Sequence, residues 1–384
     1  MDITGKKIGI VGGGQLGKMM ILEAKRLGFY VAVLDPAAGC PAHSICDLHI
    51  IADLEDAGAY IELSKNVDVV TYEWENISVN ALEILENEGQ KVYHSATTLK
   101  AIQNKHSQNI VLHSNAIPVP RFKKIVNIED IRDAGKEENF GYPLMLKTTT
   151  GGYDGKGTAL IRAEEDVENA FTQLGSGVKE LMVEEFVDFE KEISIIACRG
   201  TGGKKVVYPI AENTHENSIL DTTIVPARIS EAVYKKAIDI GNKVMSTLEF
   251  VGTFCIEMFV TKQGEVYVNE IAPRPHNSGH YTIEGCFANQ FENHIRAIVG
   301  LPLGDVCLIS PTVMVNLLGE NSGRAKLLGL EEAYNDPCVQ VHLYGKSESK
   351  AGRKMGHYTV IGETVEDTTS RAMALKKIVR VVGE

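Results

Sequence analysis

Residues Lys147–Thr158 read KTTTGGYDGKGT, and they join two short apolar segments, Pro143–Thr148 and Thr158–Ile161, that are typical of β-strands. Four of these residues are glycines. The segment is not a Walker A loop, because no Gly-Lys-Ser/Thr sequence leads into a helix. It is typical of a strand–loop–strand flap whose backbone N–H groups and lysines lie over phosphates and whose glycines permit closure. The alternative is an ordinary hairpin turn with surface lysines.

A second glycine-rich segment, Gly12–Gly17 (GGGQLG), follows the strand pattern of Lys7–Val11 and precedes residues with helical spacing. A second strand, Tyr30–Leu34, ends at Asp35. This βαβ order predicts a parallel sheet and matches the fingerprint of dinucleotide-binding domains. The motif alone leaves three alternatives open, namely a dinucleotide, another phosphate ligand, or a tight turn without a ligand. An NAD-dependent oxidoreductase would also need residues for hydride transfer, and none is evident.

Two carboxylates are expected to face each other in the second half of the chain. Gln263 and Gly264 resemble a two-residue hairpin turn between alternating strands. That turn would pair Lys262 with Glu265 and would place Glu257 directly opposite Glu270. Because like charges opposite each other are destabilising, a divalent cation such as Mg²⁺ is the natural partner for the pair. Otherwise one carboxylate turns to solvent or pairs with an arginine.

Composition narrows the classes of function. The 384 residues have a formal net charge of −12, and 44% of them are hydrophobic, as in a folded protein of two or three domains. The acidic balance argues against binding to nucleic acid or to anionic membranes. No apolar run of about 20 residues is present, and the N-terminus lacks the apolar core of a signal peptide. The seven cysteines form no CxxC pair, which favours free thiols in the cytoplasm.

Six segments of the sequence resemble one family, and together they span nearly the whole chain. The segments are Gly12–Met19 (GGGQLGKM), Tyr72–Asn76 (YEWEN), Gly151–Gly157 (GGYDGKG), Thr223–Arg228 (TIVPAR), Val268–Tyr281 (VNEIAPRPHNSGHY) and Arg353–His357 (RKMGH). A lysine at a strand end, a glycine-rich flap and a carboxylate pair resemble the ATP-grasp superfamily. The six segments narrow the resemblance to the N5-carboxyaminoimidazole ribonucleotide synthases.

The resemblance implies an ATP-grasp fold, with α/β architecture at the start and α+β architecture in the later domains. A Rossmann-like domain is expected at residues 1–108, and a small lid domain with the glycine loop at 109–187. A larger domain is expected at 188–384, with the ATP-grasp core reaching about residue 300 and a sandwich- or barrel-like portion after it.

The implied reaction is the ATP-dependent carboxylation of 5-aminoimidazole ribonucleotide with bicarbonate, in de novo purine biosynthesis. It yields N5-carboxyaminoimidazole ribonucleotide, ADP and phosphate by way of carboxyphosphate. The resemblance also implies Mg²⁺ and a homodimer. Because every expected ligand is anionic, we expect a locally basic site. The alternatives are another ATP-grasp ligase such as a formate-dependent purine transformylase, an NAD-dependent oxidoreductase, or an inactive nucleotide-binding regulator.

Residue roles follow from the same resemblance. The expected ATP-binding residues are Lys105, Lys147, Gly152, Tyr153, Asp154, Gly155, Lys156, Gly157, Thr158, Glu184, Glu185, Phe186, Val187, Glu192, His215, Asn269 and Glu270. The expected metal ligands are Glu257 and Glu270. The expected substrate-binding residues are Gly14, Gln15, Leu16, Glu73, Arg274, Ser278, Arg353 and Lys354. The expected catalytic residues are Tyr153, Asp154, Lys156 and His276, with Asp154 handling the proton of the substrate amine. Lys105 stands where the family usually has arginine, and Thr158 where a glutamine is common.

Overall fold

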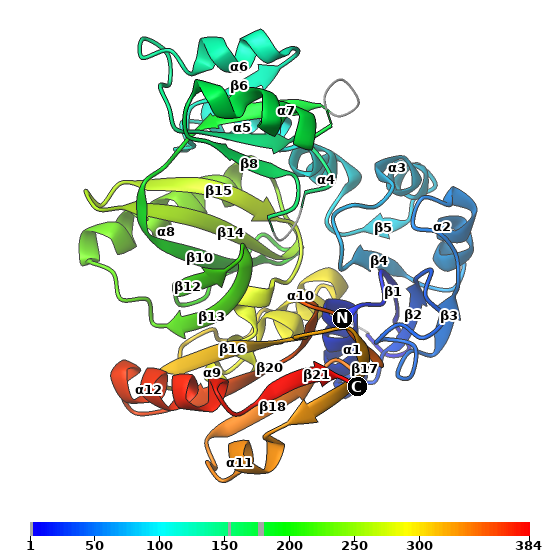
Figure 1. Ribbon diagram of the computed structural model, residues 1–384. Coiled ribbons are helices and arrows are strands. Elements are labelled where there is room, and N and C mark those ends of the chain that lie inside the picture. Colours follow the sequence, from blue (N-terminus) through cyan, green and yellow to red (C-terminus); the bar gives the residue numbers. More distant parts are fainter. Residues whose placement is uncertain (1–2, 153–154, 176–179) are drawn as a thin grey trace.

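The computed structural model describes residues 3–152, 155–175 and 180–384 (Figure 1). The first sheet has five strands in the order β3-β2-β1-β4-β5, and every neighbouring pair is parallel. Strands β1 and β2 are almost wholly buried, as expected where helices cover both faces of a parallel sheet. This arrangement confirms the βαβ prediction. Its elements are β1 (Lys7–Val11), α1 (Gln15–Arg26), β2 (Tyr30–Leu34), β3 (Leu48–Ile50), α2 (Ala57–Ser64), β4 (Val69–Tyr72), α3 (Val79–Asn87), β5 (Lys91–Val92) and α4 (Ala96–Gln103).

The second sheet has four antiparallel strands in the order β6-β9-β7-β8 and stands at the top of Figure 1. Its buried face carries Leu144 and Leu146, which pack in one cluster with Ile131. Lys147 and Thr158 are paired across β7 and β8, so the predicted strand–loop–strand order is confirmed. Its elements, with the helix that precedes them, are α5 (Lys105–Ser114), β6 (Phe122–Ile125), α6 (Ile128–Ala134), β7 (Leu144–Thr148), β8 (Thr158–Ile161), η1 (Glu164–Asp166), α7 (Val167–Gln173) and β9 (Leu181–Glu185).

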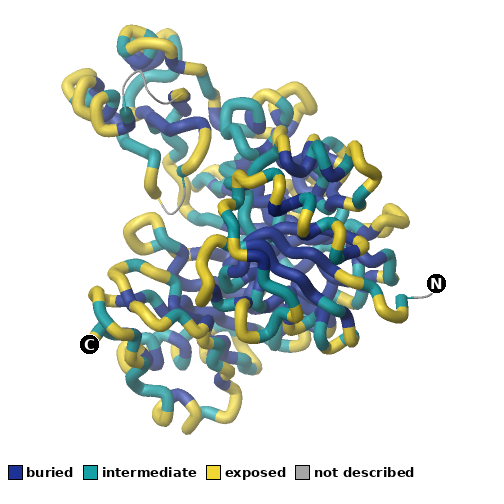
Figure 2. The backbone as a smooth tube through the Cα atoms, turned by 90° about the vertical axis from the view of Figure 1, so that its right-hand side faces the viewer, coloured by how far each residue is buried: buried dark blue, intermediate teal, exposed yellow. Residues whose placement is uncertain are grey.

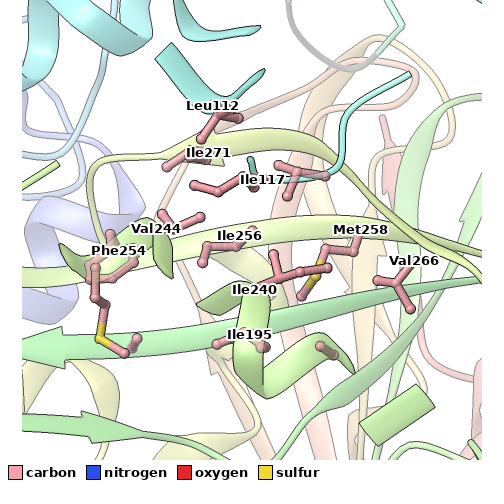
Figure 3. Close-up of a cluster of buried hydrophobic side chains, with 14 of the residues drawn as sticks. Leu112, Ile117, Ile195, Ile240, Val244, Phe254, Ile256, Met258, Val266 and Ile271 are labelled. Carbon is pink, nitrogen blue, oxygen red and sulfur yellow. The ribbon is translucent and has the colours of Figure 1, made fainter. Parts of the chain in front are cut away.

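The third sheet has nine strands, with the main order β15-β14-β10-β12-β13-β16-β20-β18, and β11 pairs with β10. Figure 3 shows its largest apolar cluster, where Ile240 and Val244 of α8 lie near Ile195 of β10 and Ile256 of β14. This packing gives the strands that carry Glu257 and Glu270 a rigid support. The elements are β10 (Phe189–Arg199), β11 (Lys205–Val207), β12 (Ala211–Glu216), β13 (Ile219–Val225), α8 (Glu231–Thr247), β14 (Gly252–Thr261), β15 (Val266–Ala272), β16 (Thr312–Leu318), β18 (Val339–Leu343) and β20 (Lys354–Ile361).

Helix α10 (Gln290–Val299) fixes the first sheet against the third. Phe291 and Ile295 are buried in the same cluster as the apolar residues of α1 and β1. Its His294 interacts with both sheets, because Nε2 lies 2.9 Å from Thr71 Oγ1 of β4 and Nδ1 accepts a 3.0 Å hydrogen bond from Thr253 N of β14. Figure 2 shows that buried residues, in dark blue, gather in the interior and that exposed residues, in yellow, lie mostly at the periphery. The residues that follow β4 and those on β14 are therefore held at fixed positions relative to each other.

The remaining described elements lie at the lower edge of Figure 1 and along the third sheet. They are η2 (Asn277–Gly279), α9 (Thr282–Gly285), β17 (Gly323–Leu328), α11 (Leu330–Tyr334), β19 (Glu348–Ser349), α12 (Val365–Lys376) and β21 (Arg380–Gly383). Strands β19, β17 and β21 form a small sheet. None of the helices in the described ranges is long and apolar enough to cross a membrane.

Candidate active site

A cavity of about 920 Å³ opens where the three large sheets meet. The five-stranded sheet contributes Glu73, which directly follows β4, and the four-stranded sheet contributes Lys147. The nine-stranded sheet contributes Glu257 and Glu270. Ligands of α/β sheets bind at the carboxyl ends of parallel strands, and the segment after β1 and Glu73 after β4 are at such ends. The cavity therefore brings together residues that are far apart in the sequence.

Glu257 and Glu270 are paired across β14 and β15, as predicted. The predicted turn is wrong, however, because Thr261 N donates to Glu265 O at 2.9 Å and Lys262 is therefore not paired with Glu265. The loop between these residues is one residue longer than predicted, and the ladder shifts by one residue between Glu257 and Met258. The bulge cancels the longer turn, so the two carboxylates still face each other.

The surroundings of this carboxylate pair fit a divalent cation. Lys105 Nζ lies 2.6 Å from Glu270 Oε2, and His276 Nε2 lies 3.6 Å from Glu257 Oε1. Burial and the neighbouring charge of Glu270 together raise the pKa of Glu257 to about 7, although the charge of His215 opposes the shift. Two adjacent carboxylates, one of them short of cationic partners, are oxygen donors of the kind that Mg²⁺ takes alongside nucleotide phosphates.

Lys147 is held in the cavity by a buried polar cluster. Its Nζ lies 2.5 Å from Glu184 Oε2 and 3.4 Å from Asn269 Oδ1. The other oxygen of Glu184 accepts a 2.8 Å hydrogen bond from Asn109 Nδ2. Lys147 lies on β7 and Glu184 on β9, both in the four-stranded sheet. Asn269 lies on β15 of the nine-stranded sheet, so this cluster joins the two sheets. The ammonium group is thereby oriented at the cavity wall.

The connection from β9 to β10 forms another part of the wall, with Glu184, Glu185, Phe186 and Val187. Beyond it, the imidazole Nδ1 of His215 is hydrogen-bonded to Glu192 Oε2. Burial alone would lower the pKa of His215, but the hydrogen bond and charge of Glu192 outweigh it and raise the pKa. The two side chains thus form a hydrogen-bonded pair that also lines the cavity.

The first glycine-rich segment does not have its N–H groups available to a dinucleotide. Glu73 accepts hydrogen bonds from the backbone N–H groups of Gly14 and Gly17, the latter at 2.6 Å, and Asp35 Oδ2 accepts one from Gly13 N at 2.7 Å. These donors are the ones that would otherwise meet a pyrophosphate at the start of α1. The protein's own carboxylates occupy that place, which explains the fingerprint without a dinucleotide.

Arg274 and Glu75 connect the first sheet to the segment after β15. Arg274 Nη2 donates to Glu75 Oε1 at 3.0 Å, its Nε donates to Glu75 Oε2, and both side chains are mostly buried. Its guanidinium carbon lies 5.9 Å from the ring centre of Trp74. Burial would raise the pKa of Glu75, but Arg274 holds that pKa below its usual value. Glu75 was not predicted as a site residue, and only its place in the YEWEN segment pointed to it.

His276 is oriented by a chain of hydroxyl and amide groups. Its Nδ1 lies 2.9 Å from the Ser278 hydroxyl, which lies 2.8 Å from the Ser194 hydroxyl. Asn213 Nδ2 donates to Ser194 Oγ at 2.9 Å. Burial and the charge of Arg274 lower the pKa of His276 well below its usual value, so the ring is neutral. The hydrogen bond to Ser278 thus fixes the orientation of the His276 ring.

Near the C-terminal part of the cavity, Lys354 lines the wall and Lys346 lies beside it. Lys346 Nζ donates to Lys354 O at 2.8 Å and to Gln15 Oε1 at 3.0 Å. Burial lowers the pKa of Lys346 to about 8, and Arg353 contributes in the same direction. Lys346 was missed, because a single lysine between a glycine and a serine carries no motif.

Most of the site residues predicted from the sequence line this cavity. Those that line it are Gly14, Gln15, Leu16, Glu73, Lys105, Lys147, Gly152, Gly155, Thr158, Glu184, Glu185, Phe186, Val187, Glu192, His215, Glu257, Asn269, Glu270, Arg274, His276 and Lys354. Lys156, Gly157, Ser278 and Arg353 are described but do not line it, and Arg353 Nη1 instead donates to Glu348 O at 2.7 Å. Tyr153 and Asp154 lie outside the described residues.

The positive charge expected at the site came partly from Mg²⁺, and the described side chains of the wall are by themselves acidic on balance. The described part of the wall carries about twice as many carboxylates as lysines and arginines. Several of these carboxylates are already paired, as Glu75 is with Arg274 and Glu270 with Lys105. The sequence identified the cations but could not show that Lys105, Lys147 and Arg274 each have a carboxylate partner.

Comparisons with known proteins agree with this geometry. Three family models match the chain, namely the ribonucleotide synthetase preATP-grasp domain at residues 5–103, the ATP-grasp domain at 110–291 and the phosphoribosylaminoimidazole carboxylase C-terminal domain at 312–371. The N5-carboxyaminoimidazole ribonucleotide synthase of Bacillus subtilis is 40% identical over 377 residues, which cover 96% of each chain.

Solved structures give the same result. The N5-carboxyaminoimidazole ribonucleotide synthetase of Thermotoga maritima superimposes with a TM-score of 0.90 at 48% identity, covering 99% of this chain and 100% of that one. The Aspergillus clavatus enzyme in complex with ADP and 5-aminoimidazole ribonucleotide superimposes with a TM-score of 0.89 at 33% identity, covering 97% and 98%.

The fold and the site together define an ATP-grasp ligase. The defining features are the four-stranded sheet, the facing carboxylates of the nine-stranded sheet and the parallel sheet that precedes both in the chain. This class excludes the NAD-dependent oxidoreductase considered above. Within it, the chain belongs to the N5-carboxyaminoimidazole ribonucleotide synthase family. It is an ATP-dependent ligase of purine biosynthesis that carboxylates 5-aminoimidazole ribonucleotide.

Proposed function

We propose that the chain binds ATP between the four-stranded and nine-stranded sheets and uses it to join bicarbonate to the amine of 5-aminoimidazole ribonucleotide. The observation that carries this proposal is the placement of Glu257 opposite Glu270, with Lys105 bound to Glu270 and Lys147 on the same cavity wall. Lysines and paired carboxylates at one wall are what phosphoryl transfer to bicarbonate needs. The adenine would lie against the segment 184–187, and Glu192 would hold the ribose hydroxyl groups.

Glu257 and Glu270 would hold Mg²⁺, which when bound neutralises charge on the ATP phosphates. Lys147 would contact those phosphates, and its bonds to Glu184 and Asn269 support a fixed orientation. Electrostatic groups held in place before the reaction need no reorganisation as charge develops. Lys105 would add a second positive charge beside Glu270.

The ribonucleotide would lie towards the first sheet and the C-terminal strands. Gly14, Gln15, Leu16 and Glu73 would line its site on one side, and Arg274 would complete it on the other. Lys346, Arg353 and Lys354 would bind its phosphate. This is supported by the contact between Lys346 and Lys354 O and by the lowered pKa of Lys346, to which the charges of Arg353 and Lys354 contribute in addition to burial. An anion placed there would relieve this repulsion.

Carboxyphosphate formed from bicarbonate and ATP hydrolyses rapidly in water, so the flap should close over it. Tyr153, Asp154 and Lys156 remain our predictions for groups that act on it, with Asp154 accepting the amine proton. His276, neutral and fixed by Ser278, would position the reacting groups beside Glu257.

We further propose domains at residues 1–108, 109–187 and 188–384, a division supported by the fact that strands of each large sheet fall within one range. The homodimer stays a prediction from the resemblance, and sedimentation velocity at micromolar concentration tests it. A cytoplasmic location is supported by the cysteines, since all seven are described and unbridged.

Product analysis tests the proposed reaction. The enzyme is incubated with ATP, Mg²⁺, 5-aminoimidazole ribonucleotide and ¹³C-bicarbonate, and the product is examined by carbon NMR. We expect a labelled carbamate carbon on the exocyclic nitrogen. A parallel incubation with ¹³C-formate tests the alternative activity of a formate-dependent transformylase. A formyl product from formate, with no labelled product from bicarbonate, would overturn the proposal.

A further inference from the structure

A group of metal-binding side chains lies at the edge of the first sheet, apart from the carboxylate pair. Asp35, Cys40 and His49 each offer a ligand atom, and these atoms lie within 4.8 Å of one another. In the part of the chain that the structure describes, this is the one such group of three or more histidine, cysteine and carboxylate side chains. Asp35 directly follows β2, Cys40 lies in the next loop, and His49 is on β3.

The backbone around these side chains is fixed by hydrogen bonds. Asp35 N donates to Ile50 O at 3.1 Å, and Cys40 N donates to Ala37 O at 3.0 Å. Asp35 is held from the other side as well, because its Oδ2 accepts from Gly13 N. The three side chains therefore approach one another on a backbone that hydrogen bonds already hold in place, as a metal site requires.

The sulfur–nitrogen distance within the group is close to that of a tetrahedral cation of the zinc type. Cys40 Sγ lies 3.9 Å from His49 Nε2, and a sulfur and a nitrogen bound tetrahedrally to zinc are separated by about 3.5 Å. The backbone carbonyl of Asp35 lies 3.1 Å from the same nitrogen. Thiolate and imidazole donors select zinc-like ions, whereas Mg²⁺ takes oxygen donors.

His43 supplies the outer partner that a metal-bound histidine requires. Its Nδ1 lies 3.0 Å from His49 Nδ1. If His49 Nε2 binds a cation, its Nδ1 carries the proton and donates to His43, in the arrangement that orients most metal-bound histidines. Without a cation the opposite tautomer is satisfied, since Nε2 can donate to the Asp35 carbonyl. The site can therefore exist in both states without leaving a ring nitrogen unpaired.

We propose that Asp35, Cys40 and His49 form a binding site for a thiophilic divalent cation of the zinc class, with His43 as the outer hydrogen-bond partner of His49. Binding exchanges the thiol proton of Cys40, which goes to solvent, for a sulfur–metal bond. The bound cation clamps the 35–49 segment against the Gly12–Gly17 loop. The contact between them is close, because a Cβ placed on Gly13 would lie 2.5 Å from Cys40 Sγ.

Cobalt provides the direct test, because a cobalt–thiolate bond absorbs in the near ultraviolet. The full-length protein is freed of metal with a chelator, kept reduced with a phosphine and titrated with Co²⁺ in the absence of nucleotide. We expect the charge-transfer band to saturate at one cobalt per chain and to disappear when one equivalent of Zn²⁺ is added. Zn²⁺ should also raise the thermal unfolding midpoint, since it binds the folded state.

Variants separate this site from the other cysteines. Cys40→Ser should abolish the band, and His49→Gln and Asp35→Asn should weaken cobalt binding by at least about tenfold. Cys46→Ser is the matched control, because Cys46 lies in the same loop but outside the group, and it should keep the band. Circular dichroism verifies folding, and if Cys40→Ser does not fold, His49→Gln decides. Failure of the wild type to bind, a wild-type band in folded Cys40→Ser, or wild-type cobalt affinity in folded His49→Gln would overturn the proposal.

Discussion

Glu257 and Glu270 face each other across β14 and β15 because a one-residue bulge compensates for a turn that is one residue longer than a two-residue hairpin. The two carboxylates are the basis for the proposal that this cavity binds Mg²⁺. Their proximity has a cost in the metal-free protein, since burial and the charge of Glu270 raise the pKa of Glu257 to about 7. The pair is therefore a place where function and stability oppose each other.

We predict that Glu257→Gln stabilises the metal-free protein but removes activity. A carboxyl whose pKa is raised by folding favours the folded state only while protonated, and that contribution is lost as the pH rises through about 7. Glutamine stays neutral, so at pH 8 the variant should gain roughly 1–3 kcal/mol in the free energy of unfolding. Turnover should fall by about 100-fold or more, as expected on loss of a preorganised electrostatic group.

Urea unfolding with EDTA and an ADP-release assay measure both effects. Glu265→Gln is the matched control, because Glu265 lies at the start of the same hairpin strand but is exposed and bound to Lys236. It should change neither quantity appreciably. Equal stability of Glu257→Gln and wild type at pH 8 would show that the pair carries no electrostatic strain.

Lys147→Met should leave Glu184 as a buried carboxylate that has lost its ion-pair partner and keeps the hydrogen bond from Asn109. Removing one partner of a buried ion pair costs about 3 kcal/mol or more. We therefore predict a loss of this order in urea unfolding, together with weaker ATP binding. Adding Glu184→Gln should recover much of the stability without restoring activity. If the double variant is as unstable as Lys147→Met, then the unpaired carboxylate is not the cause of the loss.

Glu73→Ala should expose the role of this carboxylate at the start of α1. The variant loses hydrogen bonds to Gly14 N and Gly17 N, and loss of a helix cap costs about 1–2 kcal/mol. We expect the KM for 5-aminoimidazole ribonucleotide to rise while the KM for ATP stays within about twofold, because we propose that Glu73 lines the ribonucleotide site. An equal rise in both would place Glu73 in the general architecture rather than at the ribonucleotide.

Stability should fall in mild acid because several histidines are buried and neutral. Burial lowers the pKa of His94 to about 4, and it lowers those of His280, His294 and His357 well below the usual value. A base whose pKa is lowered by folding takes up its proton in the unfolded state first, so stability is lost as the pH falls below about 6.5. His94 alone should contribute a loss of about 3 kcal/mol by pH 4.

Urea unfolding between pH 7.5 and 4.5 measures this dependence. His94→Gln should have a shallower loss of stability with decreasing pH than the wild type. His113→Gln is the control, because His113 is exposed at the end of α5. Identical slopes for His94→Gln and wild type would exclude His94 as a source of acid sensitivity.

Much of the fold could be predicted from the sequence where one pattern dominates a segment. The strands at Lys7–Val11, Tyr30–Leu34 and Thr158–Ile161 were predicted with the bounds that the structure has. The strand expected at Pro143–Thr148 begins one residue later, at Leu144. Helix α10 was not predicted, since residues such as Asn293 and His294 are polar and yet buried between two sheets. Their burial depends on tertiary hydrogen bonds that no local pattern encodes.

The site was predictable to the extent that motifs carry it. The facing carboxylates were found from strand register, but for a partly wrong reason, because neither the longer turn nor the bulge near Asn269 is visible in the sequence. The Gly12–Gly17 fingerprint could not reveal that Glu73, 59 residues from Gly14, takes the place of a phosphate. Lys346 and Glu75 were missed because their importance arises only when distant segments meet.

ADP release is the most direct test of the account as a whole. The purified enzyme is supplied with ATP, Mg²⁺ and bicarbonate, and the initial rate of ADP formation is measured with and without 5-aminoimidazole ribonucleotide. We predict a slow basal rate that the ribonucleotide increases by at least about tenfold, and no such increase when bicarbonate is removed. A rate that the ribonucleotide leaves unchanged would contradict the proposed function.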